Sequence, residues 1–269
     1  MKKILTLLDF SDTSINALKF AAELSVRTSA HLLIINIAQK GDDEAEARKM
    51  LDFLESELKK ASGPGLNSKS SIALGSLVPA MSKIIAEERP DLIVMGTKGA
   101  SGLKRVLIGS NTVKVIANTK VPVLVIPEKA KFESFLKKGR GRIVLATDLD
   151  ELENEKAIDI LKEIALFIIE PKVRVLSVRP KGTELSVLQK MERDVLLSIF
   201  NPELESQRVT VFDSDVISGI NFYLDKKSED AGLVAMIARD TGKIIQKHYT
   251  REMASHTDLP LLVLQDTKN

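Results

Sequence analysis

The sequence contains no cysteine and no tryptophan, and aromatic residues make up only 4% of its 269 residues. Without cysteine the chain can form neither a disulfide framework nor a thiolate metal site, which fits a reducing interior. An excess of either charge is also missing, since 39 basic residues face 37 acidic ones. Nothing in this balance favours DNA, RNA or an anionic membrane as a partner, so any anion site must be local.

Long hydrophobic runs are missing as well. The apolar stretch near the N-terminus covers only Ile4 to Leu8 and ends at Asp9, whereas the apolar part of a secretory signal needs roughly 7 to 15 residues. No segment reaches the approximately 18 consecutive apolar residues of a membrane span. We therefore expect a soluble cytoplasmic protein with no membrane partner.

Two common phosphate-binding motifs are absent too. The sequence has no Gly-x-x-x-x-Gly-Lys-Ser/Thr, and the turn at residues 8–14 (LDFSDTS) has no Gly-x-Gly-x-x-Gly. A P-loop hydrolase and a dinucleotide dehydrogenase both lose their main support.

The first half of the chain alternates short apolar runs with helical patterns. The apolar runs predict buried strands at residues 3–8, 31–37, 70–74, 91–95 and 121–126. Helical patterns separate them, the last from about Asn111 to Asn118. Continuous apolar strands alternating with helices predict an α/β fold, in which helices cover both faces of an open five-stranded parallel sheet.

The same layout then begins again. Asp148 follows Asp9 by 139 positions, and Met236 follows Met95 by 141. The second set of strands is predicted at residues 141–150, 173–178, 208–212, 232–238 and 258–264. The charged segment 128–142 contains no strand pattern and ends in glycines. We therefore predict a duplication, with two tandem domains at residues 1–137 and 138–269.

One helix of the second half is predicted from three apolar residues. Leu188, Met191 and Val195 recur at helical spacing and form one apolar face.

Residues 95–111 (MGTKGASGLKRVLIGSN) contain four glycines, three cationic side chains and no acid. They follow a buried strand, and ligands of open parallel sheets bind beyond the carboxyl ends of strands. Glycine lets the main chain approach a phosphate, and Ser110 begins a helix whose first turn has unpaired N–H groups. The segment predicts a phosphate site; a mobile surface loop is the alternative, and Lys98, Lys104 and Arg105 are either phosphate contacts or solvated charges.

These residues resemble the universal stress protein family. Its ATP-binding members carry Gly, two residues, Gly, nine residues, Gly and Ser/Thr, which Gly96, Gly99, Gly109 and Ser110 match without a gap. Residues 9–11 (DFS), 94–96 (VMG) and 121–125 (VPVLV) add to the likeness. The resemblance covers the first half and, more faintly, the second, so the chain looks like a tandem two-domain member.

The resemblance implies a Rossmann-like fold of the adenine nucleotide alpha hydrolase type, with ATP, AMP or ADP as ligand. It places the backbone of Ile37 beside adenine, Met95 at the entrance to the loop, and Gly96 and Gly99 along the ribose and α-phosphate. Asp9 corresponds to an acidic residue near the adenosine and the metal-bound phosphates, where Mg²⁺ is an option. On its own residues Asp9 is equally a helix-start residue.

The outer phosphates are assigned to the start of the following helix. The resemblance gives them to Gly109, Ser110 and Asn111. In the second half Ile237 replaces Gly96, and Lys247 and His248 or their neighbours replace the later Gly-Ser pair. A bulky side chain should close that site, so we predict one nucleotide pocket per chain.

The sequence favours regulatory binding over turnover. We find no base, nucleophile or carboxylate pair in the loop, and cradling phosphates does not activate water. Slow ATP hydrolysis stays open if Asp9 holds a metal ion. His31, His248 and His256 are too scattered to predict a metal site.

Two rival functions remain, and so do two modes of assembly. One rival is an enzyme that cleaves ATP at the α-phosphate, although the Ser-Gly-Gly and His-x-Gly-His signatures of such enzymes are absent. The other is a nucleotide-free scaffold. The family's dimers pair through the last strand, here 121–126, so the two halves form an internal pseudo-dimer or whole chains form a homodimer.

Overall fold

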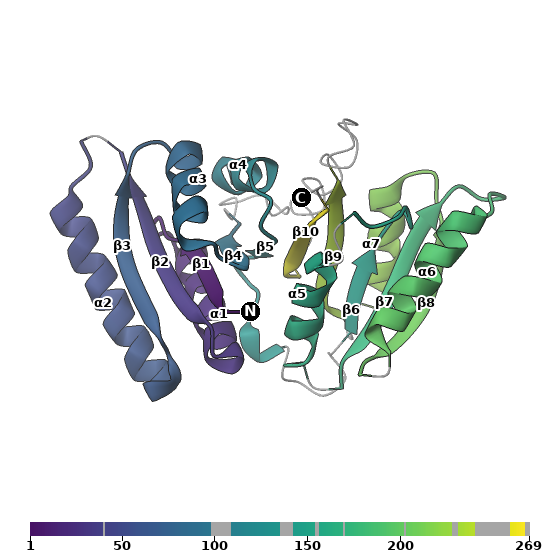
Figure 1. The fold of residues 1–269 in the computed structure, drawn as a ribbon, viewed down its shortest axis with the longest axis horizontal. Helices are drawn as coiled ribbons and strands as arrows, with labels where there is room; N and C mark the ends of the chain where they lie inside the picture. The colour runs from purple at the N-terminus through teal and green to yellow at the C-terminus, as the bar shows by residue number, and fades with distance from the viewer. Residues whose placement is uncertain are drawn as a thin grey trace. The chain divides into compact units, whose positions relative to one another are not determined.

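The structure, a computed structural model, divides into two compact units, Met1–Ala130 and Lys131–Asn269, coloured along the chain in Figure 1. The predicted boundary between residues 137 and 138 lies outside the described residues. The structure describes residues 1–39, 41–97, 109–134, 142–153, 156–168, 170–201, 203–227, 231–239 and 259–266.

The first unit contains the predicted five-stranded parallel sheet. Its strands are β1 (Lys3–Leu7), β2 (His31–Ala38), β3 (Ser68–Leu74), β4 (Leu92–Gly96) and β5 (Val123–Ile126). They lie in the order β3-β2-β1-β4-β5, and every neighbouring pair is parallel. The residues of β4 and β5 are almost all buried, as continuous apolar runs require when helices cover both faces.

Four helices cover this sheet, and side-chain caps fix where two of them begin. The helices are α1 (Asp12–Thr28), α2 (Glu44–Ser62), α3 (Leu77–Glu88) and α4 (Ser110–Asn118), with a short 3₁₀ turn η1 (Gly63–Gly65). Ser11 caps α1, and Asp43 caps α2 by accepting the N–H of Glu46. Because crossovers between parallel strands are right-handed, α1 and α2 share one face and α3 and α4 share the other.

The strand order creates one divergence point in the first unit. From β1 the chain moves outward to β2 and β3, and it then returns to β4 on the other side of β1. The connections that follow β1 and β4 therefore leave on opposite faces of the sheet. A crevice forms at such a point, beyond the carboxyl ends of the strands.

The second unit repeats this architecture. Its strands are β6 (Arg142–Ala146), β7 (Lys172–Arg179), β8 (Glu205–Phe212), β9 (Ala231–Arg239) and β10 (Leu261–Asp266), and its helices α5 (Lys156–Ala165), α6 (Val187–Phe200) and α7 (Val216–Lys227), with a 3₁₀ turn η2 (Phe132–Ser134). The order is β10-β9-β6-β7-β8, again all parallel. Thr6 pairs with Val94, and Leu145 pairs with Ala235. These pairs keep the sequence offsets of 139 and 141, so the register of the second sheet repeats that of the first.

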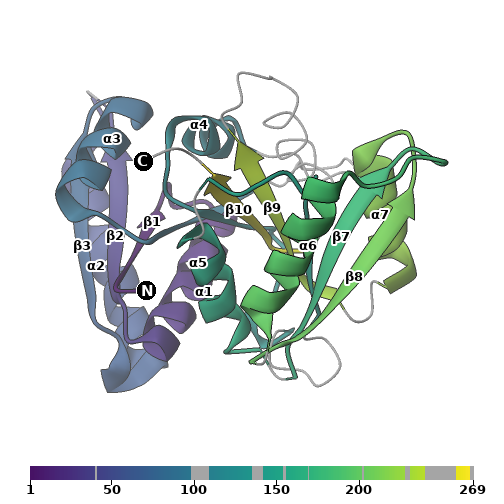
Figure 2. The same ribbon diagram turned by 45° about the vertical axis from the view of Figure 1, so that its right-hand side comes forward.

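Two helices of the second unit, α5 and α6, are labelled in Figure 2 and need separate description. The α5 helix is described from Lys156, the counterpart of Ala17, and the described residues 151–153, the counterparts of 12–14 at the start of α1, are not helical. The helix predicted from Leu188, Met191 and Val195 is present as α6, but these side chains are exposed and the buried ones are Leu196 and Phe200.

In the described part of the chain, every helix is too short or too polar to cross a bilayer.

Candidate functional site

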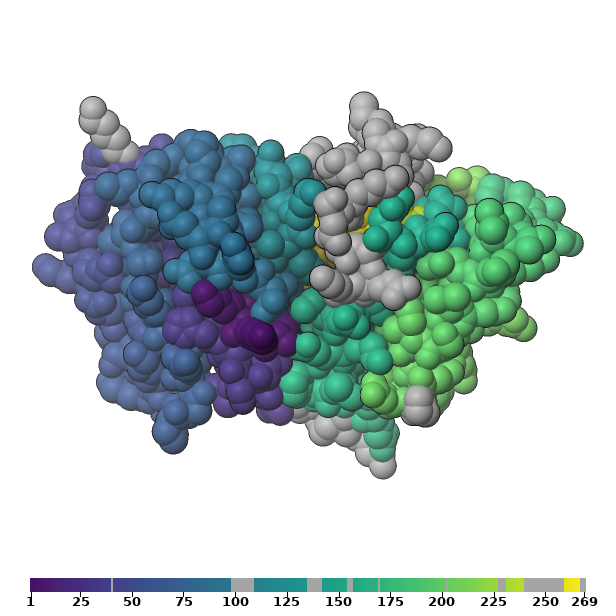
Figure 3. All heavy atoms as spheres, viewed as in Figure 1, coloured from purple at the N-terminus to yellow at the C-terminus, as the bar shows by residue number. Residues whose placement is uncertain are grey.

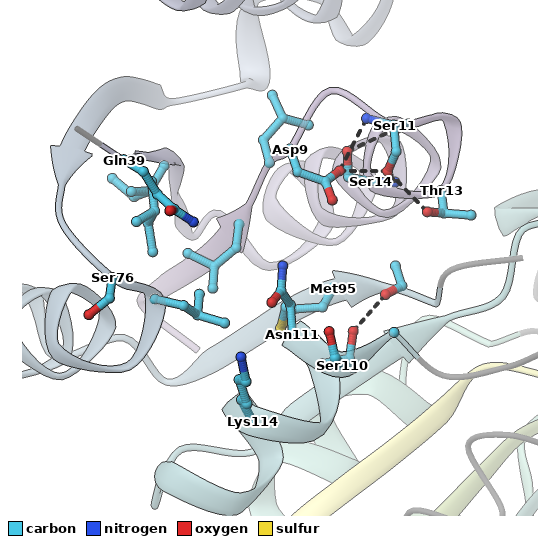
Figure 4. A pocket seen from close by; sticks show the side chains of 18 of the residues that line it. Asp9, Ser11, Thr13, Ser14, Gln39, Ser76, Met95, Ser110, Asn111 and Lys114 are labelled. Atoms are coloured by element: carbon cyan, nitrogen blue, oxygen red, sulfur yellow. Dashed lines mark hydrogen bonds between the residues drawn. The ribbon is translucent and has the colours of Figure 1, made fainter. Parts of the chain in front are cut away.

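A cavity of about 380 Å³ lies at the carboxyl ends of β1, β2 and β4 (Figure 4). Seven of the eight predicted site residues line it, although they come from separate segments of the chain. These seven are Asp9, Ile37, Met95, Gly96, Gly109, Ser110 and Asn111. The eighth, Gly99, lies outside the described residues, as do Lys98, Lys104 and Arg105. The fold therefore brings the described part of the predicted site together at the divergence point.

Three helices begin at this cavity. Residues at the starts of α1, α3 and α4 line it, including Ser14, Ser76 and Ser110. The N-cap residues of α3 and α4 make no side-chain capping bond, so the first-turn N–H groups there are not satisfied by a cap. Each helix start also carries a partial positive charge. The cavity thus presents backbone N–H groups without a side-chain cap, and a favourable potential, to an anion.

Gly109 is not required by its backbone conformation. Its φ of −64° and ψ of 144° are open to any residue. What distinguishes glycine here is the missing side chain at the entrance of α4. One turn on, the Thr112 hydroxyl donates to the Gly96 carbonyl at 2.9 Å and holds the start of α4 against the end of β4.

Packing against α1 requires glycine at position 96, and the sequence did not predict this contact. A Cβ atom built at Gly96 would lie 2.4 Å from the backbone oxygen of Thr13 and 3.0 Å from the nitrogen of Ser14. Only a bare Cα lets the first turn of α1 rest against the end of β4. The glycine therefore places a helix start at the cavity, whatever the cavity binds.

Asp9 is held in a tight turn directly after β1. Phe10 adopts a φ of 62°, and the Asp9 Oδ1 atom accepts hydrogen bonds from the Ser11 nitrogen and hydroxyl at 3.1 and 2.5 Å. Partial burial alone would raise the pKa of the Asp9 carboxyl, but hydrogen bonds from Ser11 and Ser14 outweigh it and lower the pKa below its usual value. The Asp9 carboxyl is therefore ionised at neutral pH.

Lys114 also lines the cavity, and the sequence analysis did not single it out. It lies four residues after Ser110, one turn further along α4, and Figure 4 shows its side chain running in the direction of Asn111. Within the described residues its ammonium forms no ion pair. The i, i+4 spacing from Ser110 was the signal that could have found it.

The part of the chain that forms this cavity is similar to known proteins. The model of the universal stress protein family matches residues 1–127. Residues 1–127 belong to the universal stress protein family.

Two relatives match about half of this chain. Universal stress protein MJ0577 of Methanocaldococcus jannaschii is 27% identical over 155 residues, which cover 48% of this chain and 96% of that protein. Universal stress protein YxiE of Bacillus subtilis is 28% identical over 144 residues, covering 46% and 97% respectively.

One solved structure matches almost the whole chain. A universal stress protein from Archaeoglobus fulgidus superposes with a TM-score of 0.76 at 17% identity, covering 98% of each chain. This similarity shows that both units together have the universal stress protein fold.

The turn that follows the first strand of the first unit, at Asp9 and Phe10, has a counterpart in the second unit at Asp148 and Leu149, where a different side chain lies beside it. Leu149 has a φ of 62°, as Phe10 does, and the Asp148 Oδ1 atom accepts the Asp150 N–H at 3.1 Å. Arg239, at the end of β9 and only 5% exposed, lies across this turn. It forms the Arg239 cluster with three acidic residues, Asp148, Asp150 and Asp266.

The Arg239 cluster joins three segments at the carboxyl edge of the second sheet. The guanidinium Nε donates to Asp266 Oδ2 at 2.8 Å, and its other nitrogens donate to the Asp148 carboxylate and the Asp150 carbonyl. Burial would lower the pKa of Arg239, but Asp148 and Asp266 outweigh it and raise the pKa. The sequence predicted that Ile237, Lys247 and His248 close this site. Ile237 is half-buried, and Lys247 and His248 lie outside the described residues.

The α6 helix covers this cluster. Gln189 donates its side-chain N–H to the Asp148 carbonyl at 3.1 Å. Burial raises the pKa of Glu192 above its usual value, the Arg239 charge opposes the rise, and Glu151 adds to it. The Glu192 Oε1 atom is buried without a hydrogen-bond partner.

Proposed function

We propose that the first unit binds an adenine nucleotide, ATP or its products ADP and AMP, in the 380 Å³ cavity. The observation that carries the proposal is the convergence of seven predicted residues on one crevice at the divergence point of the sheet. A cavity of this size falls within the range of about 300–1,000 Å³ typical of small-molecule sites.

The phosphates are assigned to the start of α4. Gly109 offers an unobstructed main chain there, and Ser110 and Asn111 lie at the first turn, where backbone N–H groups are unpaired. Lys114 adds a positive charge one turn further along. The base is assigned to the opposite side of the cavity, beside Ile37.

Asp9 fits a magnesium ion shared with the phosphates. An ionised carboxylate near a polyphosphate is repelled unless a cation lies between them, and Mg²⁺ is commonly held by one or two carboxylates plus substrate phosphates. Asp9 is the one carboxylate among the lining residues, and the described residues contain no group of three acidic, His or Cys side chains able to hold a metal alone. Bound there, the ion would neutralise charge.

We further propose regulatory binding over rapid turnover. Among the described residues that line the cavity there is no histidine and no carboxylate besides Asp9, and therefore no acid and base pair to activate water. The second unit is assigned no nucleotide, because the Arg239 cluster lies where the first unit keeps Asp9 accessible. A cytoplasmic role in stress responses and pairing of whole chains belong to the same proposal.

Calorimetric titration of the full chain with ATP, ADP and AMP, with and without Mg²⁺, tests the proposal. We expect one site per chain, and we expect Gly109→Val to weaken binding by about tenfold or more, a loss of at least ~1.4 kcal/mol. Asn118→Ala, at the far end of α4, is the matched control and should bind normally. Equal thermal unfolding of both variants shows that the fold is intact.

The rival functions give different results in the same protein. No heat and no thermal shift at millimolar ATP would support a scaffold and overturn the proposal. Fast release of AMP and pyrophosphate from ATP and Mg²⁺, followed by chromatography, would support the α-phosphate-cleaving enzyme. Unchanged affinity of Gly109→Val would place the nucleotide elsewhere.

A further inference from the structure

We propose that the outward face of α6 is a contact surface between two copies of this chain. Four apolar side chains lie along it, which we call the α6 stripe: Val187 is 73% exposed, Leu188 76%, Met191 60% and Val195 43%. Met191 follows Val187 by four positions and Leu188 by three, and Val195 follows Met191 by four, so the four residues share one side of the helix. In the space-filling view of Figure 3, green atoms of this segment lie at the surface.

The rotation of α6 is fixed from its inner side. Leu196 and Phe200 are fully buried beneath the helix. Gln189 is tied to the Asp148 carbonyl, and Ser186 forms a reciprocal capping box with Gln189. The helix therefore cannot turn to bury the α6 stripe within its own unit.

The equivalent helix of the first unit shows that the fold does not require such a stripe. The α2 helix also follows the second strand of its unit and covers the outer strands. Its solvent side is rich in charge, with i, i+4 pairs such as Arg48 with Asp52 at 3.7 Å and Lys59 with Glu55 at 2.8 Å. Exposed large apolar residues on α2 are limited to Met50 and Phe53.

A second copy of the chain fits the stripe because the stripe is self-complementary. A two-fold axis places the same patch opposite itself, so every feature must match its own reverse. With two α6 helices antiparallel and Met191 near the axis, Leu188 of one copy meets Val195 of the other. Lys190 and Asp194 flank the stripe on one side, and Asp194 already accepts from Arg193 of its own helix at 2.8 Å. Across the axis Lys190 of one copy then faces the Arg193–Asp194 pair of the other, and it meets the Asp194 carboxylate with opposite charge in two symmetric contacts.

The contact is small, and this sets the expected strength. One helix pair buries less than the ~1,200 Å² typical of stable complexes, so we expect a dissociation constant of about micromolar or weaker. Sedimentation of the full chain should therefore show a dimer fraction that rises with concentration. A chain that stays monomeric up to about millimolar concentration, where contacts worth only ~4 kcal/mol are populated, would overturn the proposal.

The absence of cysteine allows a direct geometric test. Met191→Cys places one thiol near the proposed axis, and mild oxidation should join two copies rapidly through a disulfide. Phe53→Cys, on the exposed side of α2, is the matched control and should cross-link at least tenfold more slowly. Equal cross-linking rates for the two variants would refute the two-fold contact.

Charge reversal provides a second test that does not depend on oxidation. Lys190→Glu and Asp194→Lys should each weaken the dimer severalfold, because like charges then meet across the axis, and the double variant should restore it. Thermal unfolding serves to confirm that each variant is folded. If the dissociation constant is the same in all three variants, the dimer forms through another surface. Neither test involves nucleotide, so the outcome is independent of the proposed nucleotide binding, and only the proposed pairing of whole chains depends on it.

Discussion

At the carboxyl edges of the two sheets the turn after the first strand has the same backbone conformation, but different groups lie beside it. Each has an acidic residue followed by a left-handed residue, Asp9 with Phe10 and Asp148 with Leu149, and both positive φ values are 62°. In the first unit the carboxylate lines a cavity. In the second, the Arg239 guanidinium occupies the turn and bonds to it. One long side chain at a strand end is enough to fill this turn with an internal ion pair.

Arg239→Met should have the largest effect. The guanidinium pairs with Asp266, and both side chains are buried, so removing one member costs about 3–5 kcal/mol because a buried carboxylate loses its countercharge. Chemical denaturation would measure the loss. The double variant with Asp266→Asn should recover part of it. A loss below about 1 kcal/mol, the scale of an exposed pair, would mean that the cluster contributes little.

Gly96→Ala should come next, and it acts on the first unit. The added Cβ meets the Thr13 backbone, so the start of α1 must shift, at a cost of about 1–3 kcal/mol. The shift should also weaken ATP binding. Gly65→Ala is a suitable control, since its Cβ would meet only Val26 at an ordinary 3.5 Å. Equal stability of the two variants would contradict the packing argument.

Lys114→Met should reduce ATP affinity without affecting stability. Because this cation is exposed, its contribution is modest, about two- to fivefold. The loss should be smaller for AMP than for ATP if the ammonium contacts the outer phosphates. Lys120→Met, two residues beyond the end of α4, should leave both affinities unchanged. An identical loss for AMP and ATP would move the contact to the α-phosphate.

Glu192→Gln should have the smallest effect, with a definite pH dependence. The pKa of Glu192 is raised in the folded chain, so its ionisation costs stability at pH values above that pKa. Removing the charge should therefore raise the melting temperature at pH 7. Below about pH 4, where the carboxyl is protonated in both states, the difference should vanish. A variant that melts lower at pH 7 would show that the Arg239 charge outweighs burial.

Much of the fold follows from the sequence because buried parallel strands are read directly from apolar runs. The runs at 31–37 and 121–126 appear as β2 and β5. The repeat of Asp9 at Asp148 predicted a second sheet of the same layout, and the strand register of the second sheet follows that of the first. The described part of the predicted site was also brought together, since its residues all follow strands whose carboxyl ends meet at one edge.

What escaped prediction depends on where side chains point in space. Helical spacing identified the apolar face of α6 but could not say whether a sheet or solvent lies beside it. Glycine at position 96 suggested close approach, and the nearest neighbour is the Thr13 backbone. Arg239 carries no local motif, because its partners lie far away in the sequence.

The left-handed residue after the first strand is present in both units, whatever lies beside the turn. Neither Phe10 nor Leu149 is glycine, so both copies accept an unfavourable backbone angle. In the first unit the residues beside that bend line the described cavity, and in the second unit Arg239 bonds to the bend. The same strained turn therefore tolerates two kinds of neighbour, a cavity in one unit and a buried guanidinium in the other.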